Sequence, residues 1–214
     1  MKKTLIFFVT VLLLMNNVVN AKELVKDNVE DTMLKETILE ETAKKIKKNN
    51  DDVKKTFEIQ MEYLNTNTKK NRDIKNYNVH VFQQFKHIKS LELYRGLTVT
   101  RATGYSRSRN KGWLDSEGVG VGPSFMLRYK RPISGKLHFA GDFTGSLMFY
   151  NKAHPAEGRA YGFLWRAGPR LVWQSTDRDS ISLGYSVCHF SNGLRTHNPG
   201  YNGMGFTLNF QHKF

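Results

Sequence analysis

The last eleven residues of the chain, MGFTLNFQHKF (204–214), alternate between two kinds of side chain. The even positions are Met204, Phe206, Leu208, Phe210, His212 and Phe214, and the odd positions are Gly205, Thr207, Asn209, Gln211 and Lys213. Successive side chains of a β-strand point to opposite faces, so this period of two predicts a strand between an apolar and a polar environment. The same pattern recurs upstream and constrains the fold of most of the chain.

Seven further segments are predicted to be strands. Residues 119–129, 137–149, 159–173 and 181–187 alternate clearly, with apolar side chains at the odd positions, and residues 56–64, 76–85 and 90–103 alternate more weakly. A water-soluble sandwich would also alternate, but it would expose its charges, whereas Asp142, Arg166 and Arg170 fall opposite the aromatic face. A polar enclosed face and an apolar lipid-facing one are typical of a transmembrane barrel. We therefore predict an all-β fold, an eight-stranded antiparallel transmembrane β-barrel over residues 56–214.

The connections agree with this topology. KHIK, RPISG and STDRD are short, whereas NTNTKKNRDIK, GYSRSRNKGWLDSE, NKAHPAEG and SNGLRTHNPGY are longer on average. With both barrel termini in the periplasm, the short turns are periplasmic and the longer loops face outward, as in outer-membrane barrels. The final Phe214 fits a C-terminal signal for the barrel assembly machinery.

The first 55 residues differ in composition from the barrel. Residues 1–21 combine two lysines, a short apolar run and a Val-Asn-Ala end, which predicts a signal peptide cut after Ala21. Its apolar run, residues 5–15, is about half of the roughly 20 residues that a spanning helix needs. Residues 22–55 contain no Gly, Pro or aromatic residue, and we expect a charged helical or disordered periplasmic extension. The expected location is the outer membrane of a Gram-negative-type envelope.

Charge and cysteine content restrict the partners. The full chain carries a formal charge of +14, and residues 56–214 hold 22 basic and ten acidic side chains, so the barrel should attract phosphate or another polyanion. Export and lipid-facing alternation argue against nucleic acid as a partner. Cys188 is the only cysteine, which excludes an intramolecular disulfide and a cysteine metal cluster, and no motif calls for a metal or an organic cofactor.

The segment CHFSNGLRTHNPGYN (188–202) carries the candidate chemistry. Strand parity places His189 and Ser191 on the lipid-facing side, and Asn202 shares the outward parity of the last strand. A serine that attacks an ester needs a base, usually a neutral imidazole, which a third group orients. No Asp or Glu follows Asp179, and Asn202 can accept a hydrogen bond from the ring without supplying a charge. The alternative is a polar rim where strand meets loop, and spacing alone favours this interpretation because His-x-Ser is a weak pattern.

The segment HFSNGLRTHNPGYN resembles the active-site segment of the lipid A 3-O-deacylase (PagL) family, outer-membrane barrels with a His-x-Ser-Asn signature and a following Asn-x-Gly loop. The resemblance extends over residues 56–214, including LELYRGLTVTRATGY, GVGPSFMLRY and GFTLNFQHKF, and leaves out residues 22–55. It implies hydrolysis of an ester-linked 3-hydroxyacyl chain from lipid A of lipopolysaccharide. Ser191 is then the nucleophile and His189 the general base and later acid. The family's best-studied type has a glutamate as third member where this chain, read through one deletion, has Asn202.

The resemblance also implies supporting residues. Oxyanion stabilisation or loop shaping falls to Asn192, Gly193, Asn198 and Gly200. Lipid A phosphates are expected to meet the basic residues in or near the outer loops: Arg101, Arg107, Arg109, Lys111, Lys152, Arg159 and Arg195. His197 is expected to be a solvated loop residue.

Two other functions stay open at the level of sequence. One is a non-enzymatic barrel that serves adhesion or membrane integrity. The other is an acyltransferase or small-ligand channel with an interior site, for which His138 and Asp142 have the right parity, although both fit an interior hydrogen-bond network better. Whether the barrel forms a homodimer is not specified by the sequence.

Overall fold

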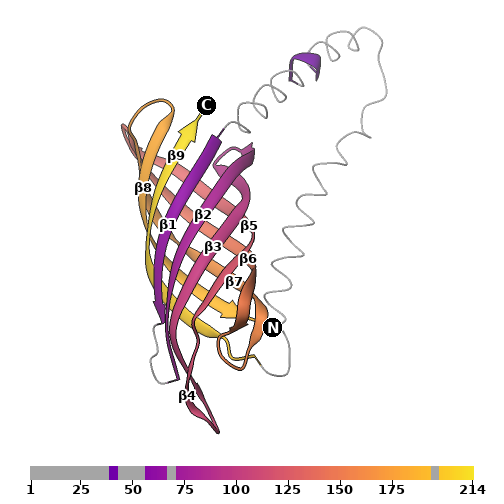
Figure 1. Ribbon diagram of the computed structural model, residues 1–214. Coiled ribbons are helices and arrows are strands. Elements are labelled where there is room, and N and C mark those ends of the chain that lie inside the picture. Colours follow the sequence, from indigo (N-terminus) through magenta and orange to yellow (C-terminus); the bar gives the residue numbers. More distant parts are fainter. Residues whose placement is uncertain (1–38, 43–55, 67–70, 194–197) are drawn as a thin grey trace, which may run out of the picture. The chain divides into compact units, whose positions relative to one another are not determined.

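The computed structural model of the chain describes residues 39–42, 56–66, 71–193 and 198–214 (Figure 1). The chain divides into two compact units, Met1–Ile46 and Lys47–Phe214. In the first unit only residues 39–42 are described, and they are helical and exposed. The predicted signal peptide lies outside the described residues, as does the rest of the predicted extension. No helix in the described part of the chain has the length and apolar character needed to cross a membrane.

The described residues of the second unit form nine antiparallel strands. They are β1 (Thr56–Thr66), β2 (Arg72–Ile88), β3 (Leu91–Ser108), β4 (Gly112–Asp115), β5 (Gly118–Ser134), β6 (Leu137–His154), β7 (Arg159–Gln174), β8 (Asp179–Ser191) and β9 (Tyr201–Lys213). Eight of them pair in the order β2-β1-β9-β8-β7-β6-β5-β3, and the pairing of β2 with β3 closes the ring. The predicted eight-stranded barrel is confirmed (Figure 1). The short β4 pairs with β3 alone and was not predicted.

The alternation of the strands decides which side chains face outward. On β9, Phe206, Leu208 and Phe210 are exposed, whereas Thr207 and Asn209 between them are buried. The same holds on β8, where Ile181 and the other odd residues up to His189 are exposed and the even residues are buried. These strands therefore turn their apolar faces away from the lumen, which is the arrangement of a barrel surrounded by lipid.

Charged side chains fill the lumen. Arg128 Nη2 donates to Glu58 Oε1 at 2.8 Å and Arg128 Nε to Asp142 Oδ1 at 2.7 Å, and Arg170 Nη2 lies 2.8 Å from Asp142 Oδ2. A space of about 10 Å³ is left between neighbouring interior side chains, about the size of one water. Asp142 thus belongs to the expected interior network, whereas His138 Nδ1 has no hydrogen-bond partner among the described residues.

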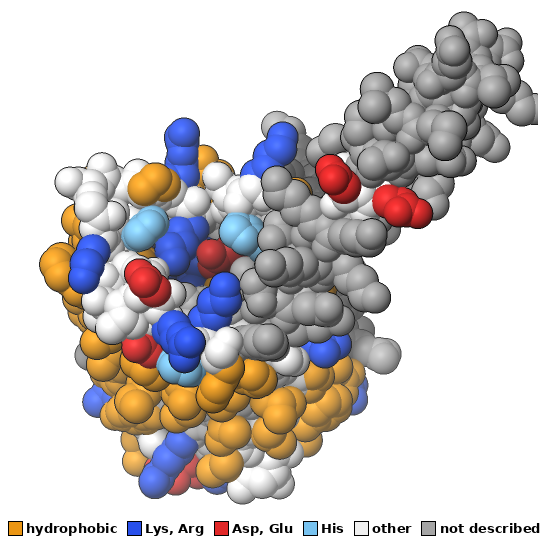
Figure 2. All heavy atoms as spheres, turned by 90° about the horizontal axis from the view of Figure 1, so that it is seen from above, with side chains coloured by type: hydrophobic (Ala, Val, Ile, Leu, Met, Phe, Trp, Pro, Cys, Tyr) orange, Lys and Arg blue, Asp and Glu red, His pale blue; other side chains and the backbone are white. Residues whose placement is uncertain are grey.

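The two ends of the barrel differ. At one end, which we call the short-turn end, tight connections follow β2, β5 and β7, and the first residue of β1 pairs with the last residue of β9, Thr56 with Lys213. Viewed from this end, basic, acidic and histidine side chains gather at the mouth, and hydrophobic side chains cover the wall in the lower part of the picture (Figure 2). The opposite, long-loop end carries β4 and the segment between β8 and β9 (Figure 1).

Several strands continue past their predicted ends, mostly at the long-loop end. β2 begins at Arg72, β3 continues to Ser108 and β6 to His154, so parts of the predicted loops are paired backbone. Backbone hydrogen bonds do not require an apolar face, so pairing can extend beyond the part of the barrel that contacts lipid.

Candidate active site

His189 and Asn202 form a hydrogen-bonded pair on the outer wall of the barrel. They are direct partners in the antiparallel pairing of β8 with β9, and both side chains are exposed. His189 Nδ1 lies 2.6 Å from Asn202 Oδ1. Because a carbonyl oxygen only accepts, Nδ1 carries the proton, and the neutral ring then presents a lone pair at Nε2. The structure thus brings together two of the three predicted catalytic residues, at the long-loop end of the wall.

Ser191 ends β8 on the same face as His189. The two residues are two positions apart, about 6.6 to 6.8 Å along the strand, and Ser191 is half-buried. Within the described part of the chain, no hydrogen bond joins the Ser191 hydroxyl to His189. Such contacts often tighten only when substrate binds.

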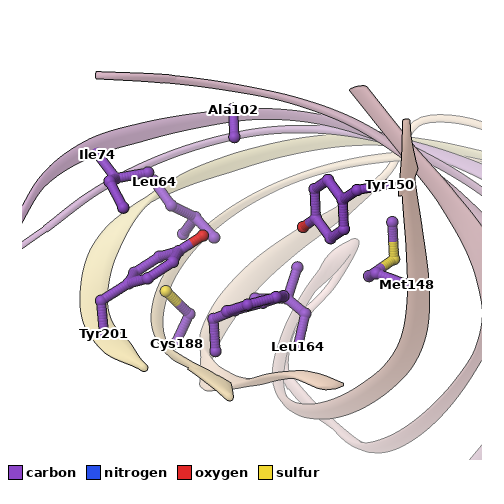
Figure 3. Packing of buried hydrophobic residues seen from close by; sticks show 9 residues of the cluster. Leu64, Ile74, Ala102, Met148, Tyr150, Leu164, Cys188 and Tyr201 are labelled. Atoms are coloured by element: carbon purple, nitrogen blue, oxygen red, sulfur yellow. The ribbon is translucent and has the colours of Figure 1, made fainter. Parts of the chain in front are cut away.

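A buried apolar cluster inside the barrel supports the strand ends that carry this pair. Phe190 and Tyr201, which alternate with the outward residues, stack at 5.2 Å between ring centroids. Tyr201 and Cys188 lie on one side of the cluster, across from Tyr150 and Met148 (Figure 3). Tyr201 Oη lies 3.0 Å from Asn76 Oδ1. The interior at this level is therefore richer in apolar and aromatic side chains than the expected polar lumen, with His154 and Asn76 buried among them. This packing supports the backbone that carries His189 and Asn202.

The segment after Ser191 is shaped by one asparagine. Asn198 Oδ1 accepts the backbone N–H of Asn192, and Asn198 Nδ2 donates to the carbonyl of Gly193, both at 3.1 Å. Gly193 has φ of +81°, a conformation that favours glycine. A Cβ on Gly200 would lie 2.6 Å from the Phe190 carbonyl oxygen and 3.6 Å from Ser191 Cβ, so only glycine fits against the end of β8.

An open groove of about 370 Å³ on the outer wall begins at His189 and Asn202. Its apolar lining comes from Phe143, Trp165, Ala167 and Val187. The Trp165 ring lies against Gly145 of the next strand, where a Cβ would approach it to 2.6 Å. The sequence analysis did not identify this groove, because the pairing of Gly145 with Trp165 depends on the register of β6 with β7.

The basic residues expected near the outer loops are spread over different environments. Arg101 is exposed on the outer wall of β3, and Arg159 is exposed at the start of β7. Lys152 forms an ion pair with Asp115 at 2.9 Å, and the exposed Lys111 lies 4.0 Å from a carboxylate oxygen. Arg195 and His197 lie outside the described residues.

Arg107 and Arg109 instead line a shared pocket of about 620 Å³ at the long-loop end. Arg72, which the sequence analysis did not single out, contributes to the same pocket. No group of three or more His, Cys, Asp or Glu side chains in the described ranges is arranged to hold a metal ion.

Comparison with known proteins gives a family match. A family model for the lipid A 3-O-deacylase (PagL) family matches residues 75–211, well over half of the chain. No curated protein sequence matches.

Solved structures with a similar chain course include the outer membrane enzyme PagL, 13% identical, with a TM-score of 0.47 over 71% of this chain and 97% of that one. Neisserial surface protein A (NspA) is 10% identical, with a TM-score of 0.49 over 74% of this chain and 95% of that one. On the strength of the family match, which includes His189, Ser191 and Asn202, this chain belongs to the lipid A 3-O-deacylase (PagL) family.

Proposed function

We propose that this protein is an outer-membrane lipid A 3-O-deacylase that uses Ser191 as nucleophile, His189 as general base and Asn202 to orient the imidazole. The observation that carries the proposal is the 2.6 Å hydrogen bond between His189 and Asn202 on the lipid-facing wall, on the strand face of Ser191. An ester substrate embedded in a membrane would meet the barrel on this wall and not in the packed lumen.

The tautomer of His189 suits the first step. With its Nδ1 proton donated to Asn202 Oδ1, the ring can accept the Ser191 hydroxyl proton at Nε2. Ser191 Oγ then attacks the carbonyl carbon of the 3-hydroxyacyl ester. When the tetrahedral intermediate collapses, the ester C–O bond breaks and the sugar oxygen leaves with the proton from Nε2.

A water molecule completes the reaction. His189 removes its proton, the hydroxide attacks the acyl-enzyme, and Ser191 Oγ takes the proton back as the 3-hydroxy fatty acid leaves. Asn202 holds the ring throughout but supplies no negative charge to offset the imidazolium that forms at each step.

Residues of the segment after Ser191 have two roles in this proposal, loop shaping and stabilisation of the oxyanion. Asn198 and Gly200 shape the loop, because the Asn198 side chain bridges two backbone groups and Gly200 packs against the end of β8. The backbone N–H of Asn192 is donated to Asn198 Oδ1, which leaves Gly193 as the candidate donor to the oxyanion.

The surroundings of the pair suit a lipid substrate. The groove lined by Phe143 and Trp165 offers an apolar surface beside His189 for the acyl chain that is cut. Among the basic residues, Arg159 at the start of β7, the strand beside β8, and the exposed Lys111 are candidates for lipid A phosphates. Arg101 stands on β3, on the opposite side of the ring from β8, and Lys152 is paired with Asp115.

The proposal also assigns an orientation in the membrane. The long-loop end faces outward, and the short-turn end faces the periplasm together with the extension, residues 22–55, after removal of the signal peptide, residues 1–21. Phe214 is exposed at the short-turn end and packs edge-on against Phe57 at 5.7 Å, a position at which the barrel assembly machinery could contact it.

Mass spectrometry of lipid A tests the function in cells. Cells that express the wild-type protein should lose one 3-hydroxyacyl chain from lipid A, and cells that express Ser191→Ala at the same level in the outer membrane should not. A non-enzymatic barrel for adhesion or membrane integrity predicts identical lipid A in both. Unchanged lipid A in cells with correctly assembled wild-type protein would therefore refute the deacylase.

A further inference from the structure

The pocket at the long-loop end is built from four separate segments of the chain. Arg72 begins β2, Arg107 and Arg109 come from the hairpin between β3 and β4, Glu157 from the turn between β6 and β7, and Pro199 from the segment before β9. Its volume of about 620 Å³ lies within the range of small-molecule sites, about 300 to 1,000 Å³. The pocket is therefore large enough for more than a single ion.

The charge of the pocket is positive and largely unpaired. Three arginines face one carboxylate, Glu157, which already accepts a hydrogen bond from Ser108 at 2.9 Å and lies 4.0 Å from Lys111. Among the described residues, neither the Arg107 nor the Arg109 guanidinium makes an ion pair or a hydrogen bond. Each of these guanidinium groups offers five N–H donors that protein atoms do not use.

Arg72 is held in place by backbone oxygens. Its Nε donates to the Pro199 carbonyl at 3.2 Å, and its Nη1 donates to the carbonyls of Asn71 at 2.7 Å and Arg107 at 3.3 Å. None of these acceptors carries a full negative charge. Partial burial lowers the pKa of Arg72, and Glu157 opposes this shift. An anion in the pocket would stabilise the charged guanidinium further.

The pocket also adjoins the segment that follows the nucleophile. Pro199, part of its wall, precedes Gly200, which packs against the Phe190 carbonyl and Ser191 Cβ. A ligand that contacts Pro199 and Arg72 would therefore lie close to the last residue of β8, at the long-loop end of the barrel.

We propose that Arg72, Arg107 and Arg109 form a binding site for a phosphorylated sugar, the headgroup of the lipid whose ester reaches Ser191. Guanidinium groups bind phosphate with paired N–H donors, and a fixed headgroup would limit which ester reaches the nucleophile. The choice of lipid rests on the proposed function, whereas the recognition of a phosphorylated sugar rests on the pocket itself.

Binding without turnover tests the site. The probes are bisphosphorylated lipid A and lipid A from which both phosphates have been removed, each titrated in detergent micelles into the full chain carrying Ser191→Ala. In that background Arg107→Gln with Arg109→Gln is compared with a control of equal charge change, Arg131→Gln with Arg178→Gln, at exposed residues of the short-turn end. The Kd for the phosphorylated lipid should rise about tenfold or more in the pocket variant and stay unchanged in the control. The Kd for the dephosphorylated lipid should be the same in all proteins.

Three results would overturn the assignment. The first is equal affinity of the pocket variant and the control for bisphosphorylated lipid A. The second is an equal loss of affinity for both lipids in the pocket variant, which would indicate damage to the loop and not a phosphate site. The third is full displacement of the lipid by inorganic phosphate at the same phosphate concentration, which would identify a free-phosphate site. A wild-type protein that binds as expected but hydrolyses nothing would refute the deacylase and leave the pocket intact.

Discussion

Replacing Asn202 with aspartate would change the charge beside His189 and little else. Asn and Asp have the same shape, so the contact of 2.6 Å between the side-chain oxygen and His189 Nδ1 can be kept. In the wild type this oxygen orients the ring but does not stabilise the imidazolium that forms when Ser191 gives up its proton. An aspartate would do both.

The expected gain follows from Coulomb's law. Two unit charges about 4 Å apart attract by about 1 kcal/mol in water and about 4 kcal/mol at an effective dielectric constant of about 20. Both side chains are exposed, so we use the lower part of this range, about 1.4 kcal/mol, which corresponds to a roughly tenfold higher kcat for Asn202→Asp. Asn202→Ala removes a hydrogen bond that strengthens as the ring becomes charged, about 1.5 to 3 kcal/mol, and should lower kcat about tenfold to a hundredfold.

The assay is the initial rate of 3-hydroxy fatty acid release from lipid A by purified protein in one detergent. Asn151→Asp is the matched control, because it adds the same charge at an exposed residue of β6 whose side-chain oxygen already accepts the backbone N–H of Val119. If Asn202→Ala were as active as the wild type, the hydrogen bond would have no part in catalysis. If the aspartate and alanine variants were equally impaired, the electrostatic reasoning would be wrong.

Three further predictions concern the groove, the lumen and pH. Trp165→Ala should raise KM about tenfold and leave kcat nearly unchanged in the same assay, because the groove loses apolar surface but not the reacting groups. Arg128→Ala leaves Glu58 as a buried carboxylate without its main partner and should lower the free energy of unfolding by about 3 to 5 kcal/mol, measured by urea titration in lipid vesicles. Burial lowers the pKa of His154, beyond the lipid-facing part of β6, to about 4. Since the unfolded chain binds this proton near pH 6.5, stability should fall by about 3 kcal/mol as pH drops from 6.5 to 4, and His154→Gln should flatten this dependence.

The barrel could be predicted because lipid and lumen impose opposite demands on alternate residues. Because of this contrast, alternation predicted the strands between Val119 and Phe206, and it predicted that the His189 side chain points outward. The contrast weakens at the long-loop end, where the exposed Arg107 and Trp113 pair on the outer face of β3 and β4, so the extension of β3 to Ser108 and the four-residue strand β4 were not predicted.

Contacts between distant segments account for what the sequence analysis missed. The pocket joins Arg72, Arg107, Glu157 and Pro199, which only the closed ring brings together. The groove depends on the Trp165 ring lying over a glycine of the neighbouring strand, and this pairing requires the register of β6 with β7. Periodicity assigns a residue to a face but does not identify its neighbour there.

The release of fatty acid by purified protein tests the central claim most directly. Wild-type protein, Ser191→Ala and His189→Ala are incubated with lipid A in the same detergent, and free 3-hydroxy fatty acid is quantified by mass spectrometry. The wild type should release one 3-hydroxyacyl chain per lipid A molecule, and both variants, folded to the same extent, should release about a thousandth of that rate or less. Release by Ser191→Ala at the wild-type rate would contradict the account.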